Sequence, residues 1–514
     1  MAAPRPTRHD SPATLEARLA RLDRSDGASV TAQLVSLFSA AIDSGELAPG
    51  SKLPPTRRLA ALAGINQLTA SRAYRRLQDL GAVVSEVGRG TFVRVAVAGA
   101  RSADLADGTC WQSYVLPPDR NDESDRVIGE IARHVEDPDV IALSAGYPAL
   151  DLIPLEALRD ATARSIERHG ARAFQYGPIE GVAETRIALA ELGRSRGLHD
   201  DANSIVITTG ARQALTLAAR ATIRPGDKVA CESPTFMGII EALRTAGAEL
   251  FPLPIDDDGL DVEALEQLLR RHEIRLLATQ PRLHNPTGVD LSAERRTRLV
   301  ELAQRHGFFI LEDAVYGDLR FEGREHGPLR ALSPTHVIYV DSLSKTVGPG
   351  LRAGWVAASG PVLDRIVAEK RRDDAHGATL TQHTTACFLA SGLYPPQLER
   401  ARARYRASRD VLLEALDAEF GDIARYRAPA GGGHIWVTLR RPLDDAALYR
   451  EAIAAGVTFV PGPAMLVERP RATHLRLSYG LPDAAEMREG VRRLAAVVRS
   501  LSAATPQRRS VPVT

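Results

Sequence analysis

The chain has 514 residues, of which 44% are hydrophobic and 25% charged, and its formal net charge at neutral pH is +1. This length exceeds what one hydrophobic core usually serves, so we expect at least two domains, and the balanced charge excludes a protein that binds polyanions through its overall charge. Three widely spaced cysteines exclude a disulfide framework and a cysteine metal site, and we predict no metal site of any kind. The N-terminus lacks the apolar stretch of a secretion signal, and no run of about 18 apolar residues occurs, so we expect a cytoplasmic protein without a membrane segment.

The first part of the chain predicts a mobile lead-in over residues 1–27 and a compact domain over residues 28–96. Within that domain the apolar spacing and the glycine stops predict three helices, which are followed by two strands joined by a Gly-Arg-Gly turn. Three helices followed by a hairpin are typical of a winged helix-turn-helix, a fold that binds duplex DNA.

The charge of this domain points the same way. Between Pro49 and Arg94 there are eight Lys or Arg residues and only two acidic residues. Such clustering suits the phosphates of duplex DNA, although a small helical domain with a solvated basic face would also produce it. The candidate DNA contacts are the basic and polar side chains of the two later helices and the hairpin tip: Arg57, Arg58, Asn66, Gln67, Thr69, Arg72 and Arg89. Of these, Asn66 stands at the expected N-cap of the last helix.

Residues 45–93, from GELAPGSKLPPTRRLAALAG to GRGTFV, resemble the GntR-type winged helix over nearly the whole length of that family's pattern. The chain departs from the pattern at one informative place, because Asn66-Gln67 stands where the family usually has Ser-Arg. The resemblance therefore implies DNA binding but not a base specificity.

The remainder of the chain is predicted to contain a linker, a large domain and a tail. Residues 97–139 are rich in Ala, Gly, Pro and Asp without periodicity, and we expect an interdomain linker there. Residues 140–503 alternate helical patterns with short apolar runs, which predicts an α/β domain with a mostly parallel sheet and a smaller α+β lobe near the C-terminus. We expect residues 504–514 to be disordered.

Lys345 is the first candidate for chemistry. The chain has only four lysines among its 65 basic residues, and unlike arginine a lysine amine can lose its proton and attack a carbonyl. Ser342, Ser344 and Arg352 lie close by in DSLSKTVGPGLR, and hydroxyls beside an arginine and a glycine turn can hold a phosphate. An amine next to a phosphate site is what pyridoxal phosphate requires, although a solvated loop with an incidental lysine would share these residues.

Other predicted strand ends supply what a pyridoxal ring needs. Gly210 opens a helix whose first amides, at Ala211 and Arg212, can meet a phosphate. Asp313 follows an apolar run and can keep the pyridine nitrogen protonated, while Asn285 and Tyr316 can donate to the phenolic oxygen. Phe236 offers a flat face for stacking.

Taken in order, YGPIEG, TTGARQAL, ESPTF, HNPTG, EDAVYGDL, SLSKTVGPGLRAGW and LRLSYG resemble a fold-type I, class I aminotransferase over about residues 140–501. The resemblance implies that Lys345 carries pyridoxal phosphate with Asp313, Asn285, Tyr316 and Phe236 around its ring, and that Ser342, Ser344, Arg352 and the Gly210 loop hold its phosphate. It also implies that Tyr176 reaches the phosphate of a neighbouring subunit and that Arg476 grips the carboxylate of an incoming amino compound.

A GntR-like winged helix joined to such a domain resembles the MocR-type regulators across nearly the full chain. That family implies a head-to-tail homodimer in which an amine or amino acid effector undergoes aldimine exchange at Lys345 and changes how the dimer binds DNA. Many such regulators have a His-Gln-aromatic-Pro stretch where this chain has the enzyme-like HNPTG, so a working aminotransferase with an appended DNA-binding domain stays open. A plain DNA-binding protein whose large domain only dimerises is the third hypothesis.

Overall fold

The structure is a computed structural model, and it describes residues 15–19, 29–43, 46–48, 50–79, 82–86, 90–93, 129, 133–134, 137–468, 470 and 472–504. The chain divides into two compact units, residues 1–120 and 121–514. Most of the predicted lead-in and linker, nearly all of the predicted tail, and Arg89 lie outside the described residues.

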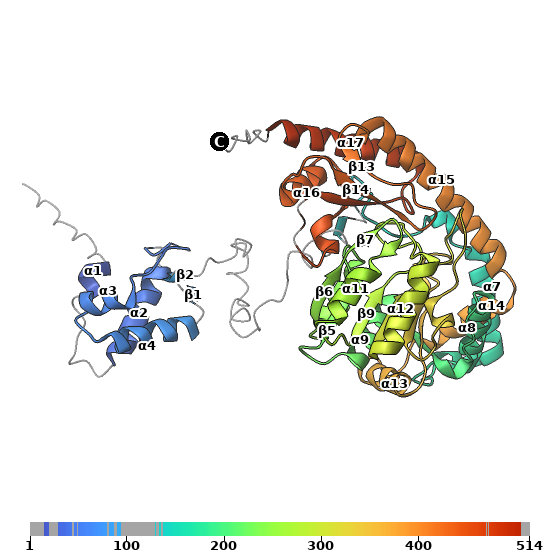
Figure 1. The fold of residues 1–514 in the computed structure, drawn as a ribbon, viewed down its shortest axis with the longest axis horizontal. Helices are drawn as coiled ribbons and strands as arrows, with labels where there is room; N and C mark the ends of the chain where they lie inside the picture. Colours follow the sequence, from blue (N-terminus) through green and yellow to red (C-terminus); the bar gives the residue numbers. More distant parts are fainter. Residues whose placement is uncertain are drawn as a thin grey trace, which may run out of the picture. The chain divides into compact units, whose positions relative to one another are not determined.

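The first unit has the predicted helices followed by the predicted hairpin (Figure 1). The hairpin strands pair antiparallel. The elements are α1 (Leu15–Leu19), α2 (Val30–Asp43), α3 (Thr56–Leu62), α4 (Gln67–Asp79), β1 (Val83–Glu86) and β2 (Gly90–Val93). Part of the predicted mobile lead-in belongs to this unit, because Leu19 of α1 is buried in its core.

The core of the first unit fixes the orientation of α4. Tyr74 of α4 lies edge-on to Phe38 of α2, with ring centroids 5.7 Å apart, and its hydroxyl donates to the carbonyl of Pro54 at 2.6 Å. Ala70, Ala73 and Leu77 lie on the same buried face. The opposite face of α4 is therefore left to solvent, as the amphipathic spacing of the helix requires.

The second unit is built on a seven-stranded mixed sheet. In spatial order its strands are β4 (Ile205–Thr208), β12 (Gly354–Ala357), β11 (Val337–Ser342), β10 (Phe309–Asp313), β9 (Leu276–Thr279), β5 (Lys228–Glu232) and β6 (Glu249–Leu253). Strand β12 runs antiparallel to both of its neighbours, and the other strands are parallel to one another. The apolar runs SIVITTG, KVACESP, RLLATQP, FFILED and VIYVDS predicted β4, β5, β9, β10 and β11, whereas β6 and β12 were missed.

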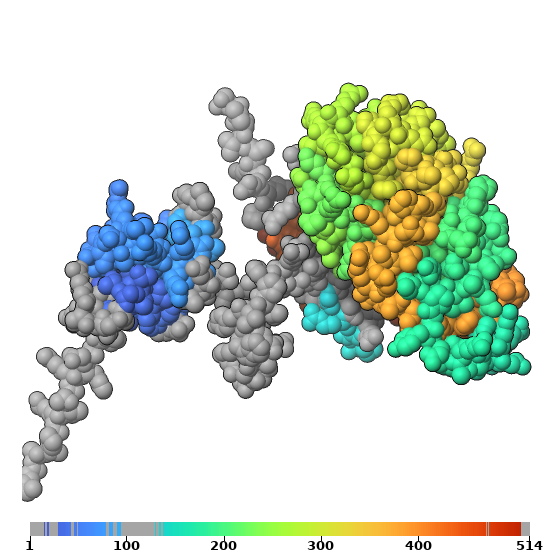
Figure 2. Space-filling view, turned by 90° about the horizontal axis from the view of Figure 1, so that it is seen from below, coloured from blue at the N-terminus to red at the C-terminus, as the bar shows by residue number. Residues whose placement is uncertain are grey.

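Helices cover both faces of this sheet, because successive strand residues point to opposite sides. Leu276 packs with α9, α10 and α13 on one face, whereas Leu277 packs with α11 and α12 on the other. Helices α7, α8 and α14 cover the second face near β4 and β12. These helices are α7 (Leu155–His169), α8 (Ala183–Ser195), α9 (Ala211–Thr222), α10 (Met237–Thr245), α11 (Val262–Leu269), α12 (Ala293–His306), α13 (Pro361–Asp373) and α14 (Thr379–Ala390). The segments of α7 and α8 lie beside that of α14 on one face of the unit (Figure 2).

A smaller lobe completes the second unit, as predicted. Its antiparallel sheet has the order β13 (Ala424–Arg425), β14 (His434–Leu439), β17 (His474–Ser478) and β16 (Val460–Pro461). The long helices α15 (Tyr394–Phe420) and α17 (Ala484–Ala504) and the shorter α16 (Asp445–Ala454) pack with this sheet around one core. Short strands pair elsewhere: β3 (Ile141–Ala142) with β15 (Val457–Thr458), and β7 (Ile255–Asp256) with β8 (Gly259–Leu260). Among the described residues, no helix combines the length and the apolar character needed to cross a membrane.

Candidate functional site

A cavity of about 340 Å³ lies where the loops after the sheet strands meet the smaller lobe. Parallel strands place their carboxyl ends at one edge of a sheet, so residues far apart in the chain come together there. Among the predicted site residues, the cavity is lined by Gly210, Ala211, Arg212, Phe236, Asn285, Asp313, Tyr316, Ser342, Ser344, Lys345, Arg352 and Arg476. Tyr176 does not line it: its side chain is 86% exposed and lies edge-on to His376.

Lys345 lies in the connection between β11 and β12, and its amine points into the cavity. The Nζ atom donates a hydrogen bond to the carbonyl of Gly146 at 2.7 Å and lies 5.8 Å from the centre of the Tyr316 ring. Burial, with the nearby guanidinium group of Arg476, lowers the pKa of Lys345 to about 8. The amine therefore loses its proton more readily than an exposed lysine, which favours attack on a carbonyl carbon.

Asp313 ends β10 and is 6% exposed. Burial raises the pKa of its carboxyl group to about 7, although the amide of Val315 donates to Oδ1 at 3.2 Å. A buried carboxyl group of this kind favours a cationic partner, because a positive charge beside it would restore its ionised form. A protonated pyridine nitrogen has that charge.

Gly210 and Arg352 form a cradle with the size and charge of a phosphate site. Gly210 has a φ of 114° and precedes α9, whose first amides at Ala211 and Arg212 have no acceptor within the helix. A Cβ atom at Gly210 would lie 2.8 Å from Nη2 of Arg352, so any side chain there would fill the space between the helix and the guanidinium. The residues present therefore fit a phosphate group.

The serines before Lys345 are held in place by their neighbours. The Ser342 hydroxyl lies 2.9 Å from the carbonyl of Ala353, to which it can donate, and 2.7 Å from the Ser344 hydroxyl. The Ser344 amide also donates to Ser342 Oγ, at 3.1 Å. This arrangement keeps the Ser344 hydroxyl beside Lys345 and Arg352 at the cavity wall.

Arg476, on β17, brings a positive charge from the smaller lobe into the cavity. Its side chain is 4% exposed, and it donates to the carbonyl of Ser144 at 2.8 Å and to Asn285 Oδ1 at 3.3 Å. Both acceptors are neutral, and Nε has no partner among the described residues. Burial lowers the pKa of Arg476 to about 10, so the group stays cationic at neutral pH. Because Asn285 presents its oxygen to Arg476, its amide hydrogens remain available to the cavity.

His434 is a cavity residue that the sequence analysis missed. Its Nε2 atom lies 2.8 Å from the hydroxyl of Tyr316, and its Nδ1 atom lies 2.9 Å from Ser478 Oγ. Burial lowers the pKa of His434 well below its usual value, so the ring is neutral. His434 lies in GGGHIWVTL, one of the apolar runs from which the strands of the smaller lobe are predicted, and a lone histidine on a strand has no spacing that would single it out.

Two of the predicted site residues have local side-chain partners. The guanidinium of Arg212 pairs with Glu241, and its backbone amide, which is the group predicted to meet a phosphate, faces the phosphate cradle. Asn66 caps α4, because its Oδ1 accepts from the amide of Thr69 at 2.8 Å and from the Thr69 hydroxyl at 2.9 Å. Its oxygen is therefore committed to the helix start, and only its amide hydrogens can reach a base edge. The other described DNA candidates, Arg57, Arg58, Gln67 and Arg72, are exposed on α3 and α4.

Comparison with known proteins agrees with these two units. Residues 138–494 match the family of class I and II aminotransferases. The chain belongs to the class I and II aminotransferase family. Its members depend on pyridoxal phosphate, so the predicted cofactor is confirmed. Residues 31–93 match the gntR family of bacterial regulatory proteins, which confirms the predicted DNA-binding domain.

Relatives of this aminotransferase-family chain include both enzymes and regulators. It is 34% identical over 379 residues to aromatic-amino-acid aminotransferase 1 of Thermococcus litoralis, covering 72% of this chain and 91% of that protein. It is 28% identical over 479 residues to the probable rhizopine catabolism regulatory protein MocR of Rhizobium meliloti, covering 92% and 94%. The crystal structure of the α-aminoadipate aminotransferase LysN of Thermus thermophilus, complexed with N-(5'-phosphopyridoxyl)-L-leucine, superposes with a TM-score of 0.69 at 33% identity, covering 74% and 96%. The predicted MocR-type organisation is therefore confirmed.

Proposed function

We propose that this protein is a transcriptional regulator that binds duplex DNA through its winged helix and senses an amino acid in the Lys345 cavity. Pyridoxal phosphate, when bound, supplies an aldehyde that condenses with amines and a ring that withdraws electrons. Lys345 would hold the cofactor, Asp313 would keep its ring nitrogen protonated, and the Gly210–Arg352 cradle with Ser342 and Ser344 would hold its phosphate.

The observation that carries the proposal is the state of Arg476. Among the described residues, this guanidinium, which is 4% exposed, has two neutral oxygens as its partners and lacks the anion that usually balances a buried charge. A ligand carboxylate would supply that anion through the paired hydrogen bonds that arginine makes best. An effector with both an amino and a carboxylate group therefore fits the cavity better than a simple amine.

Around the ring, the other cavity residues would orient the cofactor without reacting. The amide of Asn285 and the hydroxyl of Tyr316 would donate to the phenolic oxygen, and Phe236 would stack on the ring. His434 would hold the Tyr316 hydroxyl in position through their 2.8 Å contact.

A head-to-tail homodimer is part of the proposal, and DNA binding implies a cytoplasmic location. Seven of the eleven large apolar side chains exposed among the described residues lie between residues 147 and 187. Such a concentration favours a protein interface. Tyr176 belongs to this set, which supports the prediction that it reaches the phosphate site of a second copy.

A working aminotransferase is the second candidate, and it is favoured by the complete set of Lys345, Asp313, Asn285 and Tyr316 in one cavity. Measurements of operator binding and of amino acid turnover distinguish the regulator from the aminotransferase. If the protein is a regulator, one amino acid should change both the absorption spectrum of the bound cofactor and the affinity of the protein for its operator DNA. Rapid turnover of that amino acid with a keto acid, without any effect on DNA affinity, would instead support the enzyme. A colourless purified protein would defeat both.

A further inference from the structure

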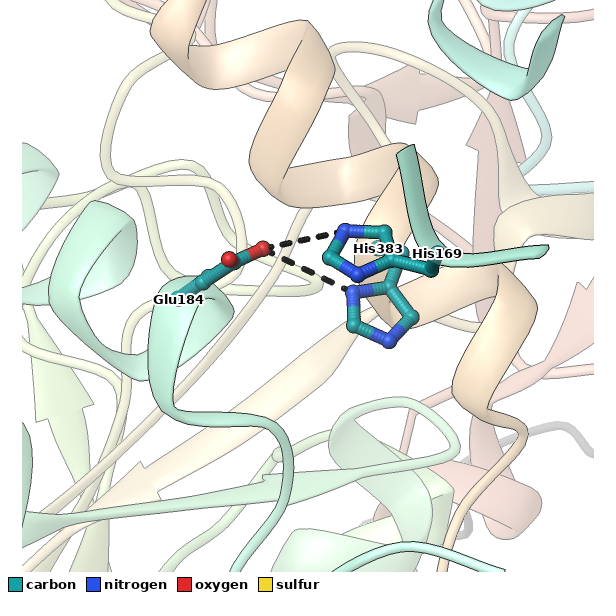
Figure 3. A group of neighbouring side chains, drawn as sticks. All are labelled: His169, Glu184 and His383. Atoms are coloured by element: carbon teal, nitrogen blue, oxygen red, sulfur yellow. Dashed lines mark ion pairs between the residues drawn. The ribbon is translucent and has the colours of Figure 1, made fainter. Parts of the chain in front are cut away.

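Two histidines and a glutamate converge outside the cavity, in the helical layer over β4 and β12 (Figure 3). His169 ends α7, Glu184 lies in the first turn of α8, and His383 lies in α14. The two imidazole rings stack with centroids 3.8 Å apart, and both direct a nitrogen at the same carboxylate oxygen. Nothing in the proposed function uses this cluster.

The spacing of these atoms fits one metal ion. Glu184 Oε2 lies 3.3 Å from His169 Nε2 and 3.6 Å from His383 Nδ1. Zinc bonds of about 2.1 Å to nitrogen and oxygen in a tetrahedron separate neighbouring ligand atoms by about 3.4 Å. All three ligand atoms lie within 4.8 Å of one another, and the stacked imidazole rings would turn so that both nitrogens point at one ion.

The ring nitrogens that face Glu184 have no other use in the described structure. His169 Nε2 and His383 Nδ1 are buried from solvent, and neither has a hydrogen-bond partner in the part of the chain that the structure describes. His383 as a residue is only 9% exposed. Glu184 by itself is explained by the start of α8, where an acidic side chain is stabilising, but that role needs no histidine.

Hydrogen bonds between the helices hold the three ligands in this arrangement. The Thr185 hydroxyl donates to the carbonyl of Gln382 at 2.8 Å, and the Gln382 side chain accepts from the amide of Val182 at 2.7 Å. These contacts join the residues next to Glu184 and His383. On the other side, the Ser165 hydroxyl donates to Cys387 Sγ at 3.3 Å, one turn before His169 and one turn after His383. These contacts hold the three helices together, so binding an ion would require movement of the side chains alone.

We propose that His169, Glu184 and His383 bind a divalent transition-metal ion, with zinc as the best match. Imidazole nitrogens and a carboxylate oxygen suit zinc, and three protein ligands leave one position for water. Glu184 also lines an open groove that offers an entry path. The other carboxylate oxygen of Glu184 lies 3.2 Å from the exposed Arg168, which would orient the carboxylate without occupying the ligand position.

Such an ion would join three helices beside the segment that leads to Tyr176. His169 is followed by the short helix η2 (Gly170–Phe174), and the Thr379 hydroxyl holds this segment to α14 through the carbonyl of Ala173 at 2.8 Å. A metal between α7 and α14 would therefore brace the Tyr176 segment. The ion would affect the stability of the protein and the position of the Tyr176 segment, because none of its three proposed ligands lines the Lys345 cavity.

The experiment is zinc titration of the full-length protein by calorimetry after treatment with a chelator. We expect one ion per chain and a rise in Tm that reverses on chelation. Cobalt(II) in place of zinc should give the visible absorption of a tetrahedral site. Glu184→Gln and His383→Gln should each weaken zinc binding at least about 100-fold, since even loss of a residue that only orients a ligand often costs tenfold or more.

The control is His306→Gln, which removes an exposed histidine from the last turn of α12 just as His169 ends α7. It should leave zinc affinity unchanged. The far-ultraviolet circular dichroism spectrum confirms that each variant is folded. If the wild-type protein binds no zinc saturably, or if Glu184→Gln and His383→Gln bind it as well as the wild type, the proposal is wrong.

Discussion

The DNA-binding unit and the Lys345 cavity use charged side chains in opposite ways. Arg57, Arg58 and Arg72 are exposed on helices, where each acts on a ligand mainly through its charge. Lys345, Asp313 and Arg476 lie in a cavity whose depth shifts the pKa of each one. An exposed charge in the first unit is one of several contributions to DNA affinity, whereas each buried charge in the cavity is essential for binding the cofactor or the effector. Substitutions should therefore act gradually in the first unit and severely in the second.

The largest expected effect is that of Lys345→Ala. Without the amine the protein cannot hold the cofactor covalently, so its visible absorption and its response to an effector should be lost, while DNA binding persists. Lys228→Ala is the matched control, because Lys228 begins β5 and contacts His272 outside the cavity. Absorption spectra and operator titrations measure both. If Lys345→Ala keeps the visible absorption of the cofactor, Lys345 does not hold the cofactor covalently, and the contrast between the cavity and the DNA-binding unit is wrong.

The next effect concerns Asp313 in the cofactor-free protein. Its folded-state pKa of about 7 lies above the unfolded value, so between about pH 4 and pH 7 the folded protein holds a proton that the unfolded chain has lost. The free energy of unfolding therefore falls as pH rises through this window, by roughly 4 kcal/mol at most. Asp313→Asn should therefore reduce the fall in Tm that accompanies a rise in pH. A smaller dependence of Tm on pH should remain in this variant, because burial also raises the pKa of Asp341, to about 6.

The control for this pH series is Asp257→Asn, because Asp257 is exposed and its loss should leave the slope as it is in the wild type. A slope that Asp313→Asn fails to change would mean that the carboxyl group is not held in its neutral form.

Arg476→Ala should weaken the response to an amino acid by about 10- to 100-fold, the usual cost of a lost hydrogen-bonded charge. An amine without a carboxylate serves as the control ligand, and its response should be unaffected. Fluorescence or absorption titration of the holoprotein gives both affinities. Equal losses for the two ligands would show that Arg476 supports the fold and does not select the carboxylate.

The smallest effect is expected from Arg72→Ala on α4. Loss of one phosphate contact should weaken binding a few-fold for all DNA sequences and reduce the slope of log affinity against log salt by about one. Arg72→Lys keeps the charge and should behave as the wild type does. If Arg72→Lys also weakens binding, and only on the operator, Arg72 reads a base.

How well the sequence predicted the site depended on where each residue lies in the fold. Asp313 and Gly210 follow apolar strands, and Lys345 follows VIYVDS. Because parallel strands end at one edge of a sheet, the sequence was sufficient to predict that these three residues meet in one site. His434 and the cluster of His169, Glu184 and His383 were missed because their meeting depends on the packing of a separate lobe and of three helices. Strand β12 was missed because its first residues belong to SLSKTVGPGLRAGW, which was interpreted as a cofactor-binding loop.

Two side chains have partners that the sequence did not identify. Asn66 is the expected N-cap of α4, and its oxygen accepts from the Thr69 amide, which leaves its amide hydrogens for a base edge. The Arg212 side chain pairs with Glu241 on the neighbouring helix, whereas the predicted phosphate donor is the Arg212 backbone amide. The sequence contains both partners in each case, yet propensity alone does not choose between them.

The antiparallel strand β12 has a further consequence. It returns the chain directly beside β11, so the Lys345 loop is attached at both ends to neighbouring strands of the seven-stranded sheet, whereas Arg476 belongs to a different, smaller sheet. Under the proposed function, a bound amino acid would span these two supports. The distance between the amino group and the carboxylate of the ligand would then decide how closely the two sheets approach each other. The protein would therefore distinguish ligands by the length of the carbon chain between these two groups.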